Sequence, residues 1–172
     1  MIKMIGSLLI LISGSSIGWI LANKYLQRIQ ELKELQLAFN ILSSEIAYGR
    51  TLLPRALKLT GGTISYPLAG IFENAGSELK KSRTGNFAEL WENIIKTYMS
   101  KSYLKSEDID ILLNWGCQVG SSDLENQINI INITIKRLQQ NEKLAKEAAE
   151  KRVKPMRYAG VLLSLMVIIL FL

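Results

Sequence analysis

The chain has 172 residues, which leaves room for one soluble domain of about 130 residues and two membrane segments. It carries 21 Lys and Arg against 15 Asp and Glu, a net charge of +6, with one cysteine and no histidine. The lack of histidine excludes the commonest metal ligand and general base, and with them most zinc, haem and Ser-His or Cys-His chemistry. A single cysteine excludes an intramolecular disulfide and favours a reducing compartment. Because no aromatic residues are interleaved with a basic patch, the excess charge indicates attraction to anionic lipid rather than to nucleic acid.

The first uncharged stretch runs from Met4 to Leu21 and is long enough for a tilted transmembrane helix. A cleaved signal peptide is the alternative, because the start is cationic and small residues lie at 13–16. Against it, apolar residues resume at 17–21, beyond any small-residue cleavage site. We therefore expect residues 1–23 to form an uncleaved N-terminal transmembrane anchor.

Two glycines in this stretch, Gly14 and Gly18, form a small-xxx-small pair. Such a pair lets a second helix approach closely, so we expect Gly14 and Gly18 to be a transmembrane packing site. The sequence leaves two partners open, the C-terminal apolar segment of this chain and a helix of another subunit.

From Lys24 to Tyr48 apolar residues recur at alternating steps of three and four, which predicts an amphipathic helix. Gly49 is expected to end this helix in the left-handed region. Thr51 is expected to cap the next helix, and Pro54 lies in its first turn, where a missing N–H breaks no internal bond.

Four further helices follow, joined by short connections. Pro67 is expected to open the third, Asn86 with Glu89 to cap the fourth and Ser106 to cap the fifth, and Ser122 to Glu125 forms a capping box for the sixth. Short connections favour antiparallel neighbours, so the predicted fold is an all-α antiparallel bundle of about six helices, flanked by a transmembrane helix at each end.

One segment at 127–135 carries a competing signal for a strand, because it is rich in β-branched residues and partly alternates. The spacing of Leu124, Ile128, Ile131, Ile135 and Leu138 nevertheless favours a helix. We expect this sixth helix to continue to Lys154, with a kink at Pro155.

The final uncharged segment, Tyr158 to Leu172, makes a helix of roughly 22 Å, shorter than the roughly 30 Å hydrocarbon core. Basic residues precede it from Lys143 to Arg157, and their long stems help to bridge the difference. By the positive-inside rule we expect a C-terminal anchor at 158–172 and a cytoplasmic helical bundle at 24–157. A buried core helix is the alternative, although core helices seldom lack a polar face.

No catalytic set is recognisable in the sequence. Glu107, Asp108 and Asp110 lie in the first turn of a helix, where the helix dipole stabilises acidic residues. Gly116 to Gly120 lacks the Lys-Ser/Thr of a phosphate loop, and Cys117 has no nearby base, so we expect it to serve in packing. We accordingly expect no cofactor and no enzymatic activity.

Several segments together resemble the stage III sporulation protein AB family, in the same order along nearly the whole chain. They are Met1 to Gly6, Leu35 to Phe39, Glu45 to Gly49, Thr51 to Ala56, Gly116 to Gly120 with Asp123 and Gln127, and the basic end with its apolar tail. The chain departs from the family pattern where Thr-Pro-Leu is frequent, since it has Thr51-Leu52-Leu53 with the proline displaced to Pro54.

The resemblance implies a non-catalytic platform in the mother-cell membrane around the forespore, within a channel complex whose other subunits come from the same operon. The domain is similar to the cytoplasmic domain of the type II secretion platform protein, which implies a cytoplasmic ATPase as partner. The family-like loops make six residues candidates for partner binding, although the glycines among them also suit helix ends: Glu45, Tyr48, Gly49, Gly116, Gly120 and Asp123.

Two other classes of function stay open at this point. One is a two-span membrane adaptor or sensor outside sporulation that dimerises through its helical domain. The other is a membrane enzyme that uses carboxylates alone, with Glu45 and Asp123 as the residues to test.

Overall fold

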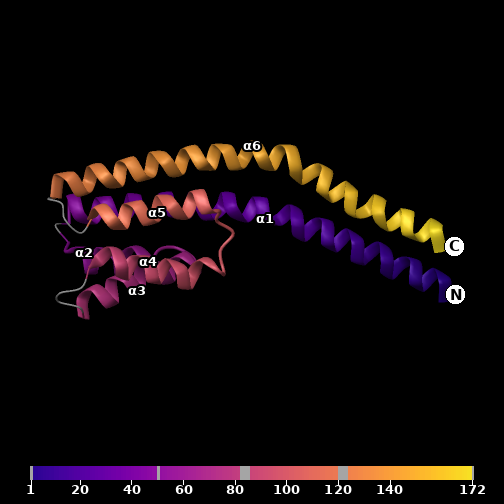
Figure 1. Ribbon diagram of the computed structural model, residues 1–172, viewed down its shortest axis with the longest axis horizontal. Coiled ribbons are helices and arrows are strands. Elements are labelled where there is room, and N and C mark those ends of the chain that lie inside the picture. The colour runs from indigo at the N-terminus through magenta and orange to yellow at the C-terminus, as the bar shows by residue number, and fades with distance from the viewer. Residues whose placement is uncertain (1, 50, 82–85, 120–123, 172) are drawn as a thin grey trace. The chain divides into compact units, whose positions relative to one another are not determined.

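The computed structural model describes the backbone of residues 2–49, 51–81, 86–119 and 124–171 (Figure 1). Within those ranges the side chains of 2–5, 7, 8, 11, 17, 124, 157, 170 and 171 are not described. The regular structure of the described residues is entirely helical, so the all-α prediction is confirmed. The helices are α1 (Ile2–Ala47), α2 (Leu53–Gly61), α3 (Leu68–Lys81), α4 (Phe87–Met99), α5 (Ser106–Val119) and α6 (Leu124–Phe171).

The two uncharged end segments are not separate helices, because they form the ends of α1 and α6. Residues 19–47 contain neither glycine nor proline, so nothing interrupts the hydrogen-bond ladder of α1 where the apolar stretch passes into the amphipathic one. Pro155 lies inside α6, and the helix continues beyond it. A proline removes one ladder bond, and the turns on either side keep α6 helical.

The chain divides into two compact units. The terminal unit consists of Met1–Ile29 with Leu144–Leu172, and the bundle unit consists of Gln30–Lys143. In the bundle unit successive helices run in opposite directions, as Figure 1 shows, with short turns between them. The antiparallel bundle predicted from the sequence is therefore confirmed.

An aromatic cluster forms the core of the bundle unit. Trp91 of α4 lies 4.7 Å from Trp115 of α5, measured between ring centroids, and 5.7 Å from Phe72 of α3. Phe39 brings α1 into the cluster, 5.1 Å from Trp115. The Trp91 indole Nε1–H donates to the Leu112 carbonyl at 2.7 Å, so the one polar atom of this side chain is satisfied.

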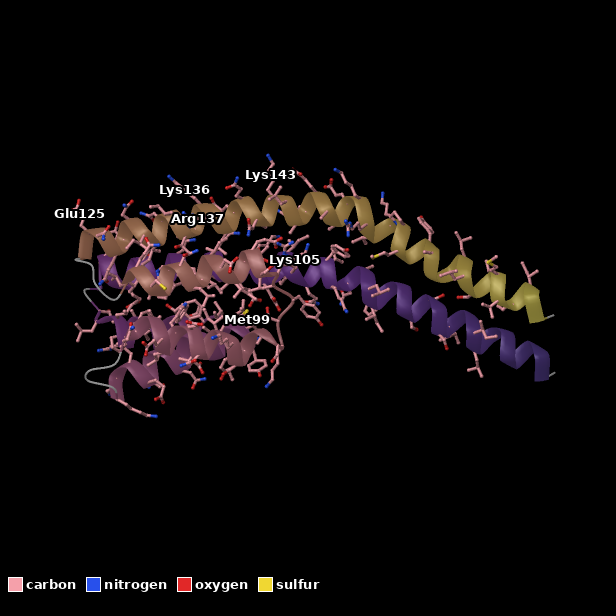
Figure 2. The ribbon with its side chains drawn as sticks, viewed as in Figure 1. Met99, Lys105, Glu125, Lys136, Arg137 and Lys143 are labelled. Atoms are coloured by element: carbon pink, nitrogen blue, oxygen red, sulfur yellow. The ribbon has the colours of Figure 1, made fainter. Side chains whose placement is uncertain are left out.

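The segment with the strand signal is helical, as the spacing predicted. Ile131, Ile135 and Leu138 are buried on the face of α6 that the four-three pattern selects. Figure 2 shows Lys136 and Lys143 pointing away from the bundle on the opposite side of α6. Burial of one face thus outweighs the β propensity of this segment.

The predicted cap at Thr51 is wrong. Leu52 is the N-cap residue of α2 and makes no side-chain cap hydrogen bond, while Pro54 lies in the first turn as expected. The Thr51 hydroxyl instead donates to Glu45 Oε2 at 3.0 Å. Asn86 does cap α4, since its side chain accepts a hydrogen bond from the Ala88 N–H.

The cluster of acids at the start of α5 is structural. Asp108 is buried, and its Oδ2 accepts a hydrogen bond from the Lys105 N–H at 2.9 Å. Its Oδ1 accepts from Asn141 Nδ2 of α6 at 2.8 Å. Asp108 therefore stabilises the first turn of α5 and links α5 to α6.

A buried carboxylate, Glu31, holds the connection between α4 and α5. Its Oε2 accepts from the Ser102 hydroxyl at 2.7 Å and from the Tyr103 N–H at 2.8 Å. Only 7% of Glu31 is exposed, and burial raises the pKa of its carboxyl above the usual 4.5, although the hydrogen bonds from Ser102 and Tyr103 oppose the shift.

We expect Glu31→Gln to flatten the pH dependence of stability. The folded state of the wild type holds the Glu31 proton more tightly than the unfolded state, so its unfolding free energy falls as pH rises from the usual 4.5 through the raised pKa. Glutamine keeps an acceptor for Ser102 and Tyr103 but does not titrate. Denaturant unfolding of the full chain in detergent, followed by circular dichroism across this pH range, measures the difference.

Glu31→Ala is the control for the hydrogen bonds themselves. It leaves the Ser102 hydroxyl and the half-buried Tyr103 N–H without their charged acceptor and should cost about 1–3 kcal/mol at every pH. Equal pH slopes for the wild type and Glu31→Gln would show that Glu31 does not titrate between the folded and unfolded states.

Candidate functional site

One end of the bundle unit is the end at which α1, α3 and α5 finish and α2, α4 and α6 begin (Figure 1). We call the described residues 48, 49, 51 and 52 at this end the distal turn. The opposite end of the unit is the one at which Gln30 and Lys143 continue into the terminal segments. The distal turn is therefore separated from those chain exits by the length of the bundle.

The distal turn is fixed by Glu45, the first of the candidate residues. The Glu45 carbonyl accepts from the Thr51 N–H at 3.1 Å, and its carboxylate accepts from the Thr51 hydroxyl. A Cβ added at Gly49 would lie 2.8 Å from both the Glu45 carbonyl oxygen and Thr51 Oγ1. Gly49 has no positive φ, so the left-handed conformation expected for it is wrong. Glycine is needed here because the backbone folds closely over Glu45.

Two apolar side chains project from this fixed turn. Tyr48 is 90% exposed and Leu52 is 80% exposed, which makes them the most exposed large apolar residues among the described ones. Leucine is a poor N-cap residue, so its presence at the start of α2 gives the helix no capping bond. Exposed large apolar residues that lie close together are typical of a contact surface for another protein.

Leu52 was not identified from the sequence. The available signal was its position, an apolar residue where the family pattern often has proline and where a capping side chain would be expected. Tyr48 was identified, and the structure places Tyr48, Gly49 and Leu52 in one turn.

The second family-like segment, Gly116 to Gly120 with Asp123, is only partly described. Gly116 is buried, and a Cβ there would collide with the Trp91 ring, so Gly116 permits close packing of α5 on α4. Gly120 and Asp123 lie outside the described residues. Cys117 is exposed, so the expectation that it serves in packing is wrong. Successive helical residues point about 100° apart, and it is Gly116 that faces Trp91.

The terminal unit contains the other predicted site, the pair Gly14 and Gly18. A Cβ on Gly160 of α6 would lie 2.6 Å from the Gly14 carbonyl oxygen and 3.1 Å from the Gly18 Cα. Ser164 packs against Gly14 from the next turn of α6. Within this chain the two end segments therefore lie backbone against backbone at Gly14, Gly18 and Gly160, which corresponds to the first of the two partners that the sequence left open.

Outward-facing side chains of the terminal unit are predominantly apolar in its two uncharged segments. The large exposed ones are Leu9, Ile12, Trp19, Ile20, Leu21, Tyr158, Val161, Leu162, Leu163, Leu165, Met166, Val167 and Ile169. A surface of this kind marks contact with an apolar environment or partner. Within the described residues, no helix is long and apolar enough to span a membrane.

Metal ligands do not cluster in the described part of the chain, where no group of three or more His, Cys, Asp or Glu side chains could hold an ion. The described surface has two features that suit contact with other molecules. One is the apolar distal turn of the bundle unit, and the other is the glycine-packed helix pair of the terminal unit, whose exterior is apolar.

Comparison with known proteins gives a consistent result. The family model described as stage III sporulation protein AB matches residues 3–172. Stage III sporulation protein AB of Bacillus subtilis (strain 168) is 26% identical over 172 residues, covering all of both chains. A solved structure of a stage III sporulation protein AB has a similar fold, with a TM-score of 0.66 and 24% identity over 72% of this chain and 97% of that one. The chain belongs to the stage III sporulation protein AB family.

Proposed function

We propose that this protein is a non-catalytic membrane platform of the mother-cell sporulation channel complex. Its terminal unit anchors it in the mother-cell membrane around the forespore beside other membrane subunits, and its bundle unit, within residues 24–157, lies in the cytoplasm. The distal turn binds the cytoplasmic ATPase of the same operon. The observation that carries the proposal is the exposure of Tyr48 and Leu52 beside Thr51, which is hydrogen-bonded to Glu45.

Three features support membrane anchoring. The segments 4–21 and 158–172 are free of charge, and cations follow the first and precede the second. The large side chains that are described as exposed on these segments are apolar. The glycine contact between α1 and α6 is the kind that holds helices together in lipid, where packing rather than the hydrophobic effect drives association.

The position of the distal turn supports an ATPase contact. Tyr48 and Leu52 are among the most exposed large apolar residues of the described chain, so the distal turn offers them to a soluble partner. Tyrosine is enriched at interfaces because it combines a large contact area with a polar group.

Replacing both apolar residues of the turn, Tyr48→Ser with Leu52→Ser, should weaken ATPase binding by about tenfold or more, as expected for a central anchor pair. Stability should change little, because both side chains are exposed. Affinity is measured with the full chain in detergent and the purified ATPase. Sporulation frequency of a strain carrying the double variant should fall in parallel.

The matched control is Leu37→Ser with Tyr66→Ser, which changes the same residue types at exposed positions away from the distal turn. It should bind the ATPase like the wild type. Equal binding by both double variants and the wild type would reject the distal turn as the contact. Wild-type sporulation after deletion of the gene would reject the platform role altogether.

A further inference from the structure

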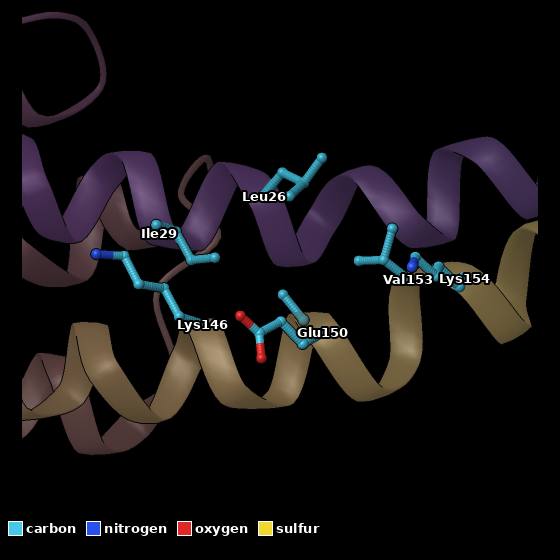
Figure 3. A pocket seen from close by; sticks show the side chains of 7 residues that line it. Leu26, Ile29, Lys146, Glu150, Val153 and Lys154 are labelled. Atoms are coloured by element: carbon cyan, nitrogen blue, oxygen red, sulfur yellow. The ribbon is translucent and has the colours of Figure 1, made fainter.

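An apolar groove with cationic side chains lies within the terminal unit, between α1 and α6 (Figure 3). It has a volume of about 270 Å³. Leu26 and Ile29 of α1 and Ala149 and Val153 of α6 give it apolar walls, and Ala149 is buried. The charged lining comes from α6 alone, as Lys146, Glu150 and Lys154.

The net positive charge of this protein lies in the same unit. Residues 1–29 and 144–172 hold eight Lys and Arg against two Glu, whereas residues 30–143 hold 13 Lys and Arg against 13 Asp and Glu. The whole net charge of +6 therefore belongs to the terminal unit. Arg152 adds a cation beside the groove residues and donates to the Tyr25 hydroxyl at 3.2 Å, which ties α6 to α1 there.

The groove also has a defined place along the chain. Its residues, 26–29 and 146–154, lie between the balanced bundle unit and the uncharged segments 4–21 and 158–172. In the membrane orientation proposed above, on which this inference rests, this is the level of the lipid headgroups on the cytoplasmic side.

We propose that this groove binds one anionic phospholipid. The phosphate and headgroup contact Lys146 or Lys154, and the first carbons of one acyl chain lie against Leu26 and Val153 before the chain enters the level of the uncharged segments. An apolar floor with a net positive rim matches an amphiphile with an anionic head, and neither a free phosphate nor a zwitterionic lipid satisfies both parts. Glu150, the single carboxylate of the lining, repels the phosphate and so weakens the binding of the lipid.

The test uses the full chain in detergent, with lipid binding followed by native mass spectrometry. Phosphatidylglycerol should bind the wild type about tenfold or more tightly than phosphatidylcholine, since each nearby lysine is worth about fivefold. Lys146→Gln with Lys154→Gln should reduce this preference to about twofold or less, and Glu150→Gln should increase it several-fold.

The matched control is Lys143→Gln with Lys151→Gln, which removes the same charge from exposed positions that do not line the groove. It should keep the phosphatidylglycerol preference. If both double variants lose the phosphatidylglycerol preference equally, the preference comes from diffuse charge. If the groove variant keeps the preference, the groove does not bind the lipid. Either result overturns the proposal.

Two further measurements distinguish a lipid from other possible occupants of the groove. Inorganic phosphate at millimolar concentration should not displace phosphatidylglycerol; displacement would show a phosphate site. Retention of a second protein chain instead of lipid, abolished by the groove variant, would show a protein interface. Membrane association is measured separately, as resistance of the full chain in cell membranes to carbonate extraction. Extraction by carbonate contradicts the anchoring proposed above, whereas a resistant chain without groove-dependent lipid preference contradicts only the lipid site.

Discussion

Trp91→Ala should lower the free energy of unfolding by about 3–5 kcal/mol, the range for truncating a large aromatic residue in a core. Trp91 is completely buried and contacts the rings of Phe72, Phe87 and Trp115 from three different helices. Its removal leaves a cavity at the point where α3, α4 and α5 meet and eliminates the hydrogen bond to the Leu112 carbonyl. Denaturant unfolding of the full chain in detergent, followed by circular dichroism, gives the change.

Two variants separate the contributions to this effect. Trp91→Phe keeps an aromatic ring in the cluster but loses the Nε1–H bond and part of the ring volume, so it should cost less than the alanine variant. Tyr48→Ala removes an aromatic ring that is 90% exposed and should change stability by no more than about 0.5 kcal/mol. A cost for Trp91→Ala as small as that of Tyr48→Ala would mean that the aromatic cluster is not the core of the bundle.

Regular periodicity explains which features of the fold were predictable from the sequence. The helical assignment of 127–135 depended on the spacing of Ile131, Ile135 and Leu138, and these residues are buried together on one face. The burial of such a face is a property of the segment itself, so local sequence carries it. Residue type at the start of a helix, which is equally local, predicted the first-turn position of Pro54 and the cap at Asn86.

Features that depend on distant contacts could not be read from the sequence. Glu31 bonds to Ser102 and Tyr103, which are 71 and 72 positions away, and no local pattern indicates that partnership. Thr51 has the right residue type for a cap, but Glu45 competes for its hydroxyl once the distal turn has formed.

The candidate sites likewise combine features that local sequence predicts with features that depend on distant contacts. The Gly14 and Gly18 motif predicted a close helix contact but left the partner open, because the partner glycine, Gly160, is more than 140 positions away. Gly116 was selected for its family-like context, and the structure shows that it faces Trp91 in the core. Exposure of Tyr48 and Leu52 is set by the turn geometry and becomes visible only in three dimensions.

Gly160→Leu should separate the two helices of the terminal unit. A Cβ at this position meets the Gly14 carbonyl oxygen at 2.6 Å and the Gly18 backbone at 3.1–3.2 Å, and backbone atoms, unlike a side chain, have no rotamer that clears the clash. The helices would have to move to the roughly 8–10 Å spacing of helices held apart by side chains. Spin labels on cysteines at exposed Trp19 and Tyr158, in a Cys117→Ser background, should report a distance longer by about 2–3 Å and a broader distribution.

Two other glycine substitutions make this result specific. Gly6→Leu should leave the distance unchanged, because no atom of the described residues lies within 4 Å of a Cβ at that position. Gly14→Ala collides first with the Ser164 side chain, so adding Ser164→Ala should relieve much of its effect, whereas Gly160→Ala has no equivalent side-chain rescue. If Gly160→Leu leaves the distance unchanged in lipid while Gly14→Leu still impairs sporulation, α1 pairs there with a helix of another subunit. Gly14 and Gly18 would then be an assembly surface of the channel complex rather than an internal contact.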